Sequence, residues 1–114
     1  MAVSFAYAIK FVADMDEAVR FHVRHLGLEL RFQSPEWSEL ETGATTLALH
    51  KASEDHPPGS CQLGFRTADV DDFHRKSVAQ GVASVAPPTD LHGQRIAKLR
   101  DPDGAEFSIS GPAR

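Results

Sequence analysis

The sequence has one cysteine, no long apolar run and no excess of positive charge, and each absence removes a class of function. Cys61 has no second thiol with which to form an internal disulfide, which is typical of a reducing compartment, so we expect a cytoplasmic protein. No apolar run approaches the roughly 18 residues that a membrane-spanning helix needs, so no membrane partner is expected. The net charge is −4, so the chain lacks the excess of basic residues with which proteins bind nucleic acid, and no nucleic-acid partner is expected.

Motifs of the common enzyme classes are also missing. The sequence contains no phosphate-binding Walker loop, no dinucleotide fingerprint, no zinc-ligand spacing and no recognisable nucleophile–base pair. Its 114 residues suffice for one domain with one modest core. Short motifs alone therefore assign no reaction.

The chain does contain an internal repeat. The pentapeptide ADMDE at residues 13–17 returns as ADVDD at residues 68–72, and Gly27 has a counterpart in Gly81. LALH at residues 47–50 likewise corresponds to FSIS at residues 107–110. A period near half the length is too long, and occurs too few times, for a solenoid. It predicts two similar modules with a shared site between them.

Each half is predicted to fold as βαβββ. Large side chains alternate with alanines along residues 5–12, which predicts a strand. Asp14 and Asp69 are predicted N-caps of two helices, and Gly27 and Gly81 are predicted C-cap glycines of the same helices. In the first helix, the stripe expected to face the core is Met15, Ala18, Val19, His22 and Leu26. The other predicted strands are 28–32, 37–41, 45–51, 62–67, 82–85, 95–100 and 106–110.

The predicted fold class is α+β: two pseudo-symmetric βαβββ modules that form a cupped mixed β-sheet with the helices on its outer face. The modules are expected at residues 1–52 and 61–114 of a single domain, with a Pro-Gly-containing linker at residues 53–60. Residues 87–93 are expected to form a loop, and Asp101 to Gly104 a tight turn. A cupped sheet has a concave face, and small ligands bind in concavities.

Several segments, in this order, resemble a known superfamily. YAIKFVAD at residues 7–14, AVRFH at 18–22 and LG at 26–27 resemble the opening of the glyoxalase/bleomycin-resistance/extradiol dioxygenase superfamily, which has the vicinal oxygen chelate fold. HGQ at residues 92–94 and RDPDG at 100–104 resemble its final hairpin. The resemblance covers nearly the whole chain, and it implies the same paired-module fold.

The resemblance also implies where a metal ion would be held. Metal-using members bind a divalent ion with His, Glu or Gln side chains at four positions, which correspond here to Tyr7, Ala48, Gln62 and Ser108. Alanine has no donor atom, serine is a poor ligand, and a neutral tyrosine is poor for most such ions. Three of the four positions depart from the metal-dependent pattern. We therefore expect no metal ion and no other cofactor.

The candidate ligand-binding residues are polar or aromatic side chains expected near the concavity. They are Tyr7, Trp37, His50, Gln62, Arg66, His92 and Ser108. Tyr7 and Trp37 are interpreted as pocket walls and Phe11 as core. His50 is either a ligand-contacting group or a polar strand end, and Arg66 either binds an anion or pairs with Glu39 or Glu41.

Other titratable residues have simpler interpretations. His22 and His25 lie one helical turn apart, so they could share an ion. We instead interpret His22 as a member of the apolar stripe and His25 as a solvated residue. His92 lies on a loop, where either a ligand contact or a solvated turn is expected. Cys61 has no basic neighbour in sequence and is expected to be inert. The helix-start aspartates are interpreted as caps.

Two functions remain from the sequence. The first is a binding protein without a metal ion that holds a small, partly aromatic molecule in the cavity. The second is a glyoxalase-like lyase, isomerase or dioxygenase whose ligands are rearranged around His50 and Gln62. A homodimer is also expected, because open sheet edges and Phe5 leave apolar surface that a twofold partner covers, at roughly 800 Å² per partner.

Overall fold

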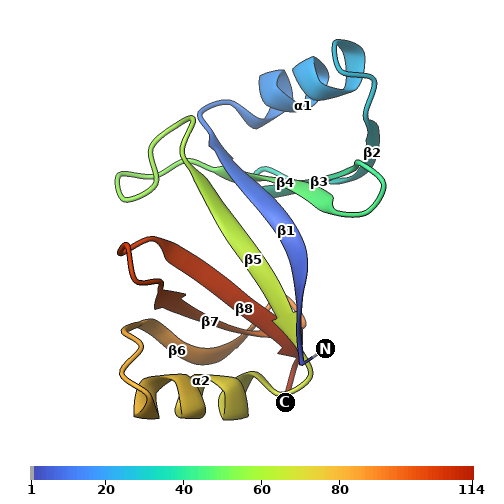
Figure 1. Ribbon diagram of the computed structural model, residues 1–114. Coiled ribbons are helices and arrows are strands. Elements are labelled where there is room, and N and C mark those ends of the chain that lie inside the picture. Colours follow the sequence, from blue (N-terminus) through green and yellow to red (C-terminus); the bar gives the residue numbers. More distant parts are fainter. Residues whose placement is uncertain (1) are drawn as a thin grey trace. The chain divides into compact units, whose positions relative to one another are not determined.

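The computed structural model describes residues 2–114, and its elements follow the repeated order that the sequence predicts (Figure 1). They are β1 (Val3–Val12), α1 (Met15–Arg24), β2 (Glu29–Gln33), β3 (Trp37–Glu41), β4 (Thr46–Lys51), β5 (Cys61–Thr67), α2 (Val70–Ala79), β6 (Ser84–Leu91), β7 (Gln94–Arg100) and β8 (Glu106–Pro112). The chain divides into two compact units, one of residues 7–61 and one of residues 2–6 with 62–114. The α+β class and the two βαβββ repeats are confirmed. Within residues 2–114, neither helix is long and apolar enough to cross a membrane.

In the unit of residues 7–61, the strand order is β2-β3-β4-β1. β1 pairs in parallel with β4, and the β2–β3 and β3–β4 pairs are antiparallel. The register places Phe11 opposite His50, and His50 opposite Trp37. Because successive strand residues point to opposite faces, one face packs on α1 and the other presents these three rings.

Helix α1 begins and ends by the local rules that its sequence indicates. The Asp14 side chain accepts a hydrogen bond of 3.0 Å from the Glu17 N–H, which satisfies one of the unpaired donors of the first turn. At the other end, Gly27 has a φ of 72°, and the Leu28 N–H donates to the His22 carbonyl. The helix itself ends at Arg24, so helical spacing no longer applies to Leu26. Leu26 was predicted on the buried stripe, but it is 54% exposed.

The apolar core of this unit lies between α1 and its sheet. Its buried members are Val12, Val19, Leu40 and Leu49. His22 is buried beside them, and its Nδ1 lies 2.7 Å from the Ala18 carbonyl. A carbonyl only accepts hydrogen bonds, so the ring nitrogen donates and His22 is satisfied within its own helix. His25 is exposed and stacks on Phe21.

The second unit repeats this plan, with strand order β5-β8-β7-β6. β5 pairs in parallel with β8, and the β8–β7 and β7–β6 pairs are antiparallel. The Asp69 side chain accepts from the Asp72 N–H at 3.0 Å and caps α2 as Asp14 caps α1. The buried core consists of Val70, Ala97, Leu99 and Ile109, with partly buried Val3 packed against it.

The predicted loop at residues 87–93 is wrong, because β6 continues to Leu91. Pro87 and Pro88 lie between the paired residues Ala86 and Thr89, at an irregularity in the pairing with β7. β6 is also last in the strand order, and proline is tolerated at strand edges and bulges because no ladder hydrogen bond is lost there. The connection shrinks to His92 and Gly93, which have φ values of 52° and 77°. Positive φ at both residues is the signature of a two-residue hairpin turn.

The predicted turn between β7 and β8 is confirmed. The Gly104 N–H donates to the Asp101 carbonyl at 2.9 Å. The Asp101 side chain also accepts from the N–H groups of Asp103 and Ala105, both at 2.9 Å. Gly104 has a φ of 85°, which residues with a Cβ rarely adopt.

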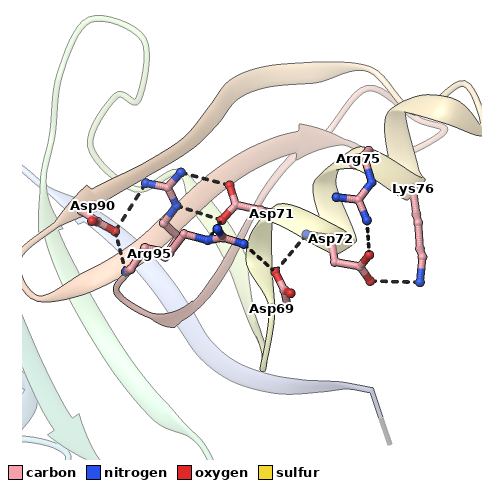
Figure 2. Close-up of polar contacts among 8 residues, drawn as sticks. Asp69, Asp71, Asp72, Arg75, Lys76, Asp90 and Arg95 are labelled. Atoms are coloured by element: carbon pink, nitrogen blue, oxygen red, sulfur yellow. Dashed lines mark hydrogen bonds and ion pairs between the residues drawn. The ribbon is translucent and has the colours of Figure 1, made fainter.

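An ion-pair network joins the first turn of α2 to the β6–β7 hairpin (Figure 2). The Arg95 guanidinium donates to both oxygens of Asp71, at 3.0 and 3.2 Å, and lies 3.5 Å from Asp90. Arg114 approaches Asp71 at 2.5 Å and Asp69 at 3.8 Å. The hydrogen bond from Arg95 holds the pKa of the Asp71 carboxyl below its usual value, and the Arg114 charge acts in the same direction.

We expect Asp71→Asn to destabilise the protein near neutral pH and to matter less in acid. A carboxyl whose pKa is lower in the folded state contributes stability above its unfolded pKa of about 3.9. That contribution is lost as the pH falls through the folded-state pKa. Urea-unfolding midpoints from pH 7 to pH 3 should therefore converge for the two proteins at the acid end. Asp55→Asn, at an exposed carboxylate of the linker, is the matched control. A gap between Asp71→Asn and the parent that stays constant across the range would contradict the assignment.

Candidate functional site

Three of the residues singled out from the sequence come together in the unit of residues 7–61. Tyr7 and Trp37 have ring centroids 5.6 Å apart at 80°, and Trp37 and His50 have centroids 5.9 Å apart at 90°. All three side chains are partly exposed, whereas Phe11, which lies 5.1 Å from His50, is only 3% exposed. We call Tyr7, Phe11, Trp37 and His50 the aromatic face. Phe11 forms its buried floor, and the other three rings stand at the surface.

A carboxylate fixes the orientation of the indole ring. The Trp37 Nε1–H donates to Glu39 Oε2 at 2.9 Å. Glu39 Oε1 lies 3.7 Å from Arg31, which also forms a closer ion pair with Glu41. Arg31 further donates to the Thr46 hydroxyl at 3.0 Å. The aromatic face is therefore bordered by two carboxylates that share one guanidinium.

Sequence reasoning did not assign these polar partners to the aromatic face. Strand alternation could have found Glu39, which lies two residues from Trp37 and so on the same face. It could not have found Arg31, which lies where the β2–β3 register shifts between Leu30 and Phe32. An irregularity of this kind has no simple sequence signal.

The hydrogen bond of His50 determines which ring nitrogen carries the proton. Its Nδ1 lies 2.7 Å from the Lys51 carbonyl oxygen. Because the carbonyl only accepts, Nδ1 is the donor, and in the neutral ring Nε2 is then an acceptor. The imidazole can therefore accept a hydrogen bond from a ligand or take up a proton from it.

The linker contributes a second imidazole to the aromatic face. His56 stacks on Phe11, with centroids 4.5 Å apart and an interplanar angle of 13°. Backbone hydrogen bonds hold the linker beside the end of β1, from the Phe11 N–H to Ser60 and from the Gly59 N–H to Phe11, both 2.9 Å. The sequence indicated only a linker here, because stacking of a loop side chain on a strand depends on the tertiary fold.

Gln62 and Ser108 lie on neighbouring strands of the other unit. Gln62 is 6% exposed, and its amide nitrogen lies 3.3 Å from Glu106 Oε1. Lys98 approaches the same carboxylate at 3.6 Å. Ser108 is opposite Gly64 in the parallel pairing, two positions along from Gln62 on the same face. The predicted pair is therefore part of a polar row that also contains Glu106, a residue that sequence reasoning missed.

Arg66 and the His92 turn border a different feature of that unit, an open depression of about 590 Å³. Arg66 is exposed and lines it directly, together with Gly93 of the turn and Gln94 at the start of β7. His92 itself is exposed in the turn. Within the described residues, Glu39 and Glu41, which were considered as partners for Arg66, form ion pairs with Arg31.

Four residues correspond to the metal ligands of the family that the sequence resembles, and their side chains do not suit a divalent ion. Ala48 is fully buried and offers only a methyl group. The Gln62 amide is engaged with Glu106, and Ser108 brings only a hydroxyl. Tyr7 brings a phenol hydroxyl, which hard or borderline divalent ions do not favour as a ligand. Across residues 2–114, no three or more His, Cys, Asp or Glu side chains are grouped in a way that could hold a metal ion.

Among known proteins, a family model and one relative both match most of the chain. The model of the Glyoxalase/Bleomycin resistance protein/Dioxygenase superfamily matches residues 4–109. An uncharacterized protein of Mycolicibacterium smegmatis is 37% identical over 103 residues, which cover 89% of this chain and 87% of the relative.

Solved structures show the same fold. Methylmalonyl-CoA epimerase from Mycobacterium tuberculosis aligns with a TM-score of 0.79 at 23% identity, over 96% of this chain and 88% of that chain. A superfamily member from Vibrio splendidus aligns with a TM-score of 0.69 at 16% identity, over 96% and 98%. At these identities the likeness shows the fold alone.

Proposed function

The chain belongs to the glyoxalase/bleomycin resistance protein/dioxygenase superfamily, and we propose that it is a binding protein that holds a small, partly aromatic molecule against the aromatic face without a metal ion. The observation that carries this proposal is the arrangement of Tyr7, Trp37 and His50. The Trp37 ring stands at near right angles to both Tyr7 and His50, and all three rings remain partly exposed. Edge-to-face contacts of this kind leave ring faces accessible for a further aromatic group.

The polar groups around the rings suit orientation of a ligand more than reaction with it. The hydrogen bond to Glu39 fixes the plane of the Trp37 indole, and the Nε2 atom of His50 and the Tyr7 hydroxyl provide polar groups beside the rings. An apolar surface with a few directed polar groups is the usual composition of a small-molecule site. The metal positions contain no set of donors that would add Lewis-acid chemistry.

The alternative is an enzyme, a lyase, isomerase or dioxygenase, with His50 and Gln62 as rearranged metal ligands. One observation favours it: the hydrogen bond from Nδ1 to Lys51 leaves Nε2 of His50 with the lone pair that a metal ion or a transferred proton requires. Elemental analysis of the purified protein separates the two functions. Stoichiometric nickel, zinc, manganese or iron would favour the enzyme over the binding protein.

Trp37 is the sole tryptophan, so its indole N–H gives one NMR signal that reports on the aromatic face. We expect 4-methylphenol to shift this signal saturably and 4-methylcyclohexanol, its aliphatic analogue, to bind at least several-fold more weakly. Tyr7→Ala should weaken 4-methylphenol binding about twofold to tenfold, because a ring–ring contact contributes about 0.5–1.5 kcal/mol beyond its area. Phe21→Ala, at an exposed helix residue, is the matched control. Equal binding of the two probes, or no effect of Tyr7→Ala, would count against the proposal.

We also infer that the protein acts as a homodimer in a reducing cytoplasm. Phe5 is 47% exposed, and every residue of β2, which is last in its strand order, is exposed. A twofold partner would cover such apolar side chains and unpaired strand edges. Cys61 is an exposed free thiol, which suits a reducing environment. Light scattering on the ligand-binding samples should give twice the chain mass of 12.4 kDa.

A further inference from the structure

We propose that the molecule bound at the aromatic face carries a positively charged nitrogen, so that the face acts as a cation–π site for a compact organic ammonium group. This inference rests on the proposed function, and it adds the charge class of the ligand. It comes from two features of the face: the arrangement of its rings and the position of Glu39.

The rings supply the surfaces that a cation prefers. An ammonium group is attracted to the face of an aromatic ring when it lies within about 6 Å of the centroid, and tryptophan is the strongest such ring. Trp37 meets Tyr7 at 80° and His50 at 90°. Because each contact is edge to face and not stacked, the rings do not cover one another completely. A methylated ammonium group placed at this corner would contact more than one ring.

The charge beside the rings is negative. Glu39 and Glu41 share the single guanidinium of Arg31, so the trio carries one net negative charge. Glu39 is the less tightly paired of the two, with 3.7 Å to Arg31, and its side chain is 24% exposed. An anionic ligand would meet uncompensated repulsion here, whereas a cation would be attracted at short range.

The hydrogen bond from the indole strengthens the same preference. Glu39 Oε2 accepts the Trp37 Nε1–H at 2.9 Å. A carboxylate at this N–H polarises the ring and increases the electron density on its faces. The carboxylate thus acts on the cation twice, directly through its charge and indirectly through the ring. Neutral aromatic ligands benefit from neither effect.

The experiment compares two probes of the same shape that differ in charge. Choline and 3,3-dimethylbutan-1-ol are titrated against the Trp37 indole N–H signal. We expect choline to bind at least about fivefold more tightly than the neutral alcohol. In Glu39→Gln, whose amide oxygen still accepts the indole N–H, the ratio of the two affinities should fall by at least about half, because the carboxylate charge is lost while the ring faces still attract the cation. Glu36→Gln removes a carboxylate with a 67% exposed side chain that approaches Lys51 and is not part of the face, and should keep the ratio of the parent.

The possible results distinguish failure of the cation site from failure of the proposed function. Equal affinities for choline and the alcohol in the parent, or a ratio that is unchanged in Glu39→Gln, would overturn the cation site while 4-methylphenol binding still supports an aromatic ligand. Choline binding that depends on Glu39, without any binding of 4-methylphenol, would uphold the cation site and remove the aromatic ligand. Circular dichroism confirms that both glutamine variants are folded before they are compared.

Discussion

Replacement of Gly111 by alanine is expected to lower the free energy of unfolding by about 3 kcal/mol or more, which is a large share of the stability of a small domain. Gly111 is buried in β8. A Cβ atom built on it would lie closer than 3.0 Å to the backbone oxygen of Thr67 and 3.1 Å from a methyl group of Val70. Thr67 ends β5 and Val70 begins α2, so the obstructing atoms belong to a short, structured connection. The substitution must displace backbone.

Thermal and urea unfolding followed by circular dichroism measure this effect. Pro112→Ala changes the next residue, which is exposed, and should stay within about 1 kcal/mol of the parent. The comparison distinguishes loss of the close approach at residue 111 from a general weakening of the strand end. A Gly111→Ala protein as stable as Pro112→Ala would mean that the 67–70 segment yields at low energy.

The importance of Gly111 could not be predicted from the sequence, whereas the helix starts could. N-caps depend on residues that are neighbours in the chain, so Asp14 and Asp69 carried enough information by themselves. The constraint at Gly111 comes from a segment more than forty residues away. Close approaches of this kind are properties of the tertiary fold.

The clearest wrong prediction about the fold concerned two prolines. Pro87 and Pro88 indicated a loop because proline cannot donate to a ladder, but they lie at an irregularity of the edge strand β6, where no donation is needed. Whether a strand lies at an edge depends on the order of strands in the sheet. The sequence pattern of a single strand does not contain that order.

The same distinction between local and tertiary information applies to the candidate site. Tyr7, Trp37 and His50 could be placed on one face because strand alternation is local and the pairing of β1, β3 and β4 preserved it. The contacts that give the face its charge were not predictable, since they depend on a shifted register at Arg31. The stacking of His56 on Phe11 depends on the path of the linker. The rings of the site could therefore be identified from sequence, and its electrostatics could not.

Truncation of one core residue in each repeat should reveal whether the two units fold together. Leu49 and Ile109 occupy corresponding positions of the repeat, and both are 0% exposed. Leu49→Ala and Ile109→Ala are each expected to lower the free energy of unfolding by about 2–5 kcal/mol, from lost burial and from the cavity that remains. Leu91→Ala, at a residue that is 52% exposed, should cost no more than about 0.5 kcal/mol.

Trp37 makes this experiment a test of cooperativity, because its fluorescence reports only on the unit of residues 7–61. Circular dichroism reports on both units. We expect Ile109→Ala to shift the fluorescence and dichroism midpoints by the same amount, as two-state unfolding of a single domain requires. The physical reason is β1, a continuous strand that packs Val3 against one core and contributes Val12 to the other. If Ile109→Ala moved the dichroism midpoint and left the Trp37 midpoint where the parent has it, the two units would be independent domains. The aromatic face could then be studied in the unit of residues 7–61 alone.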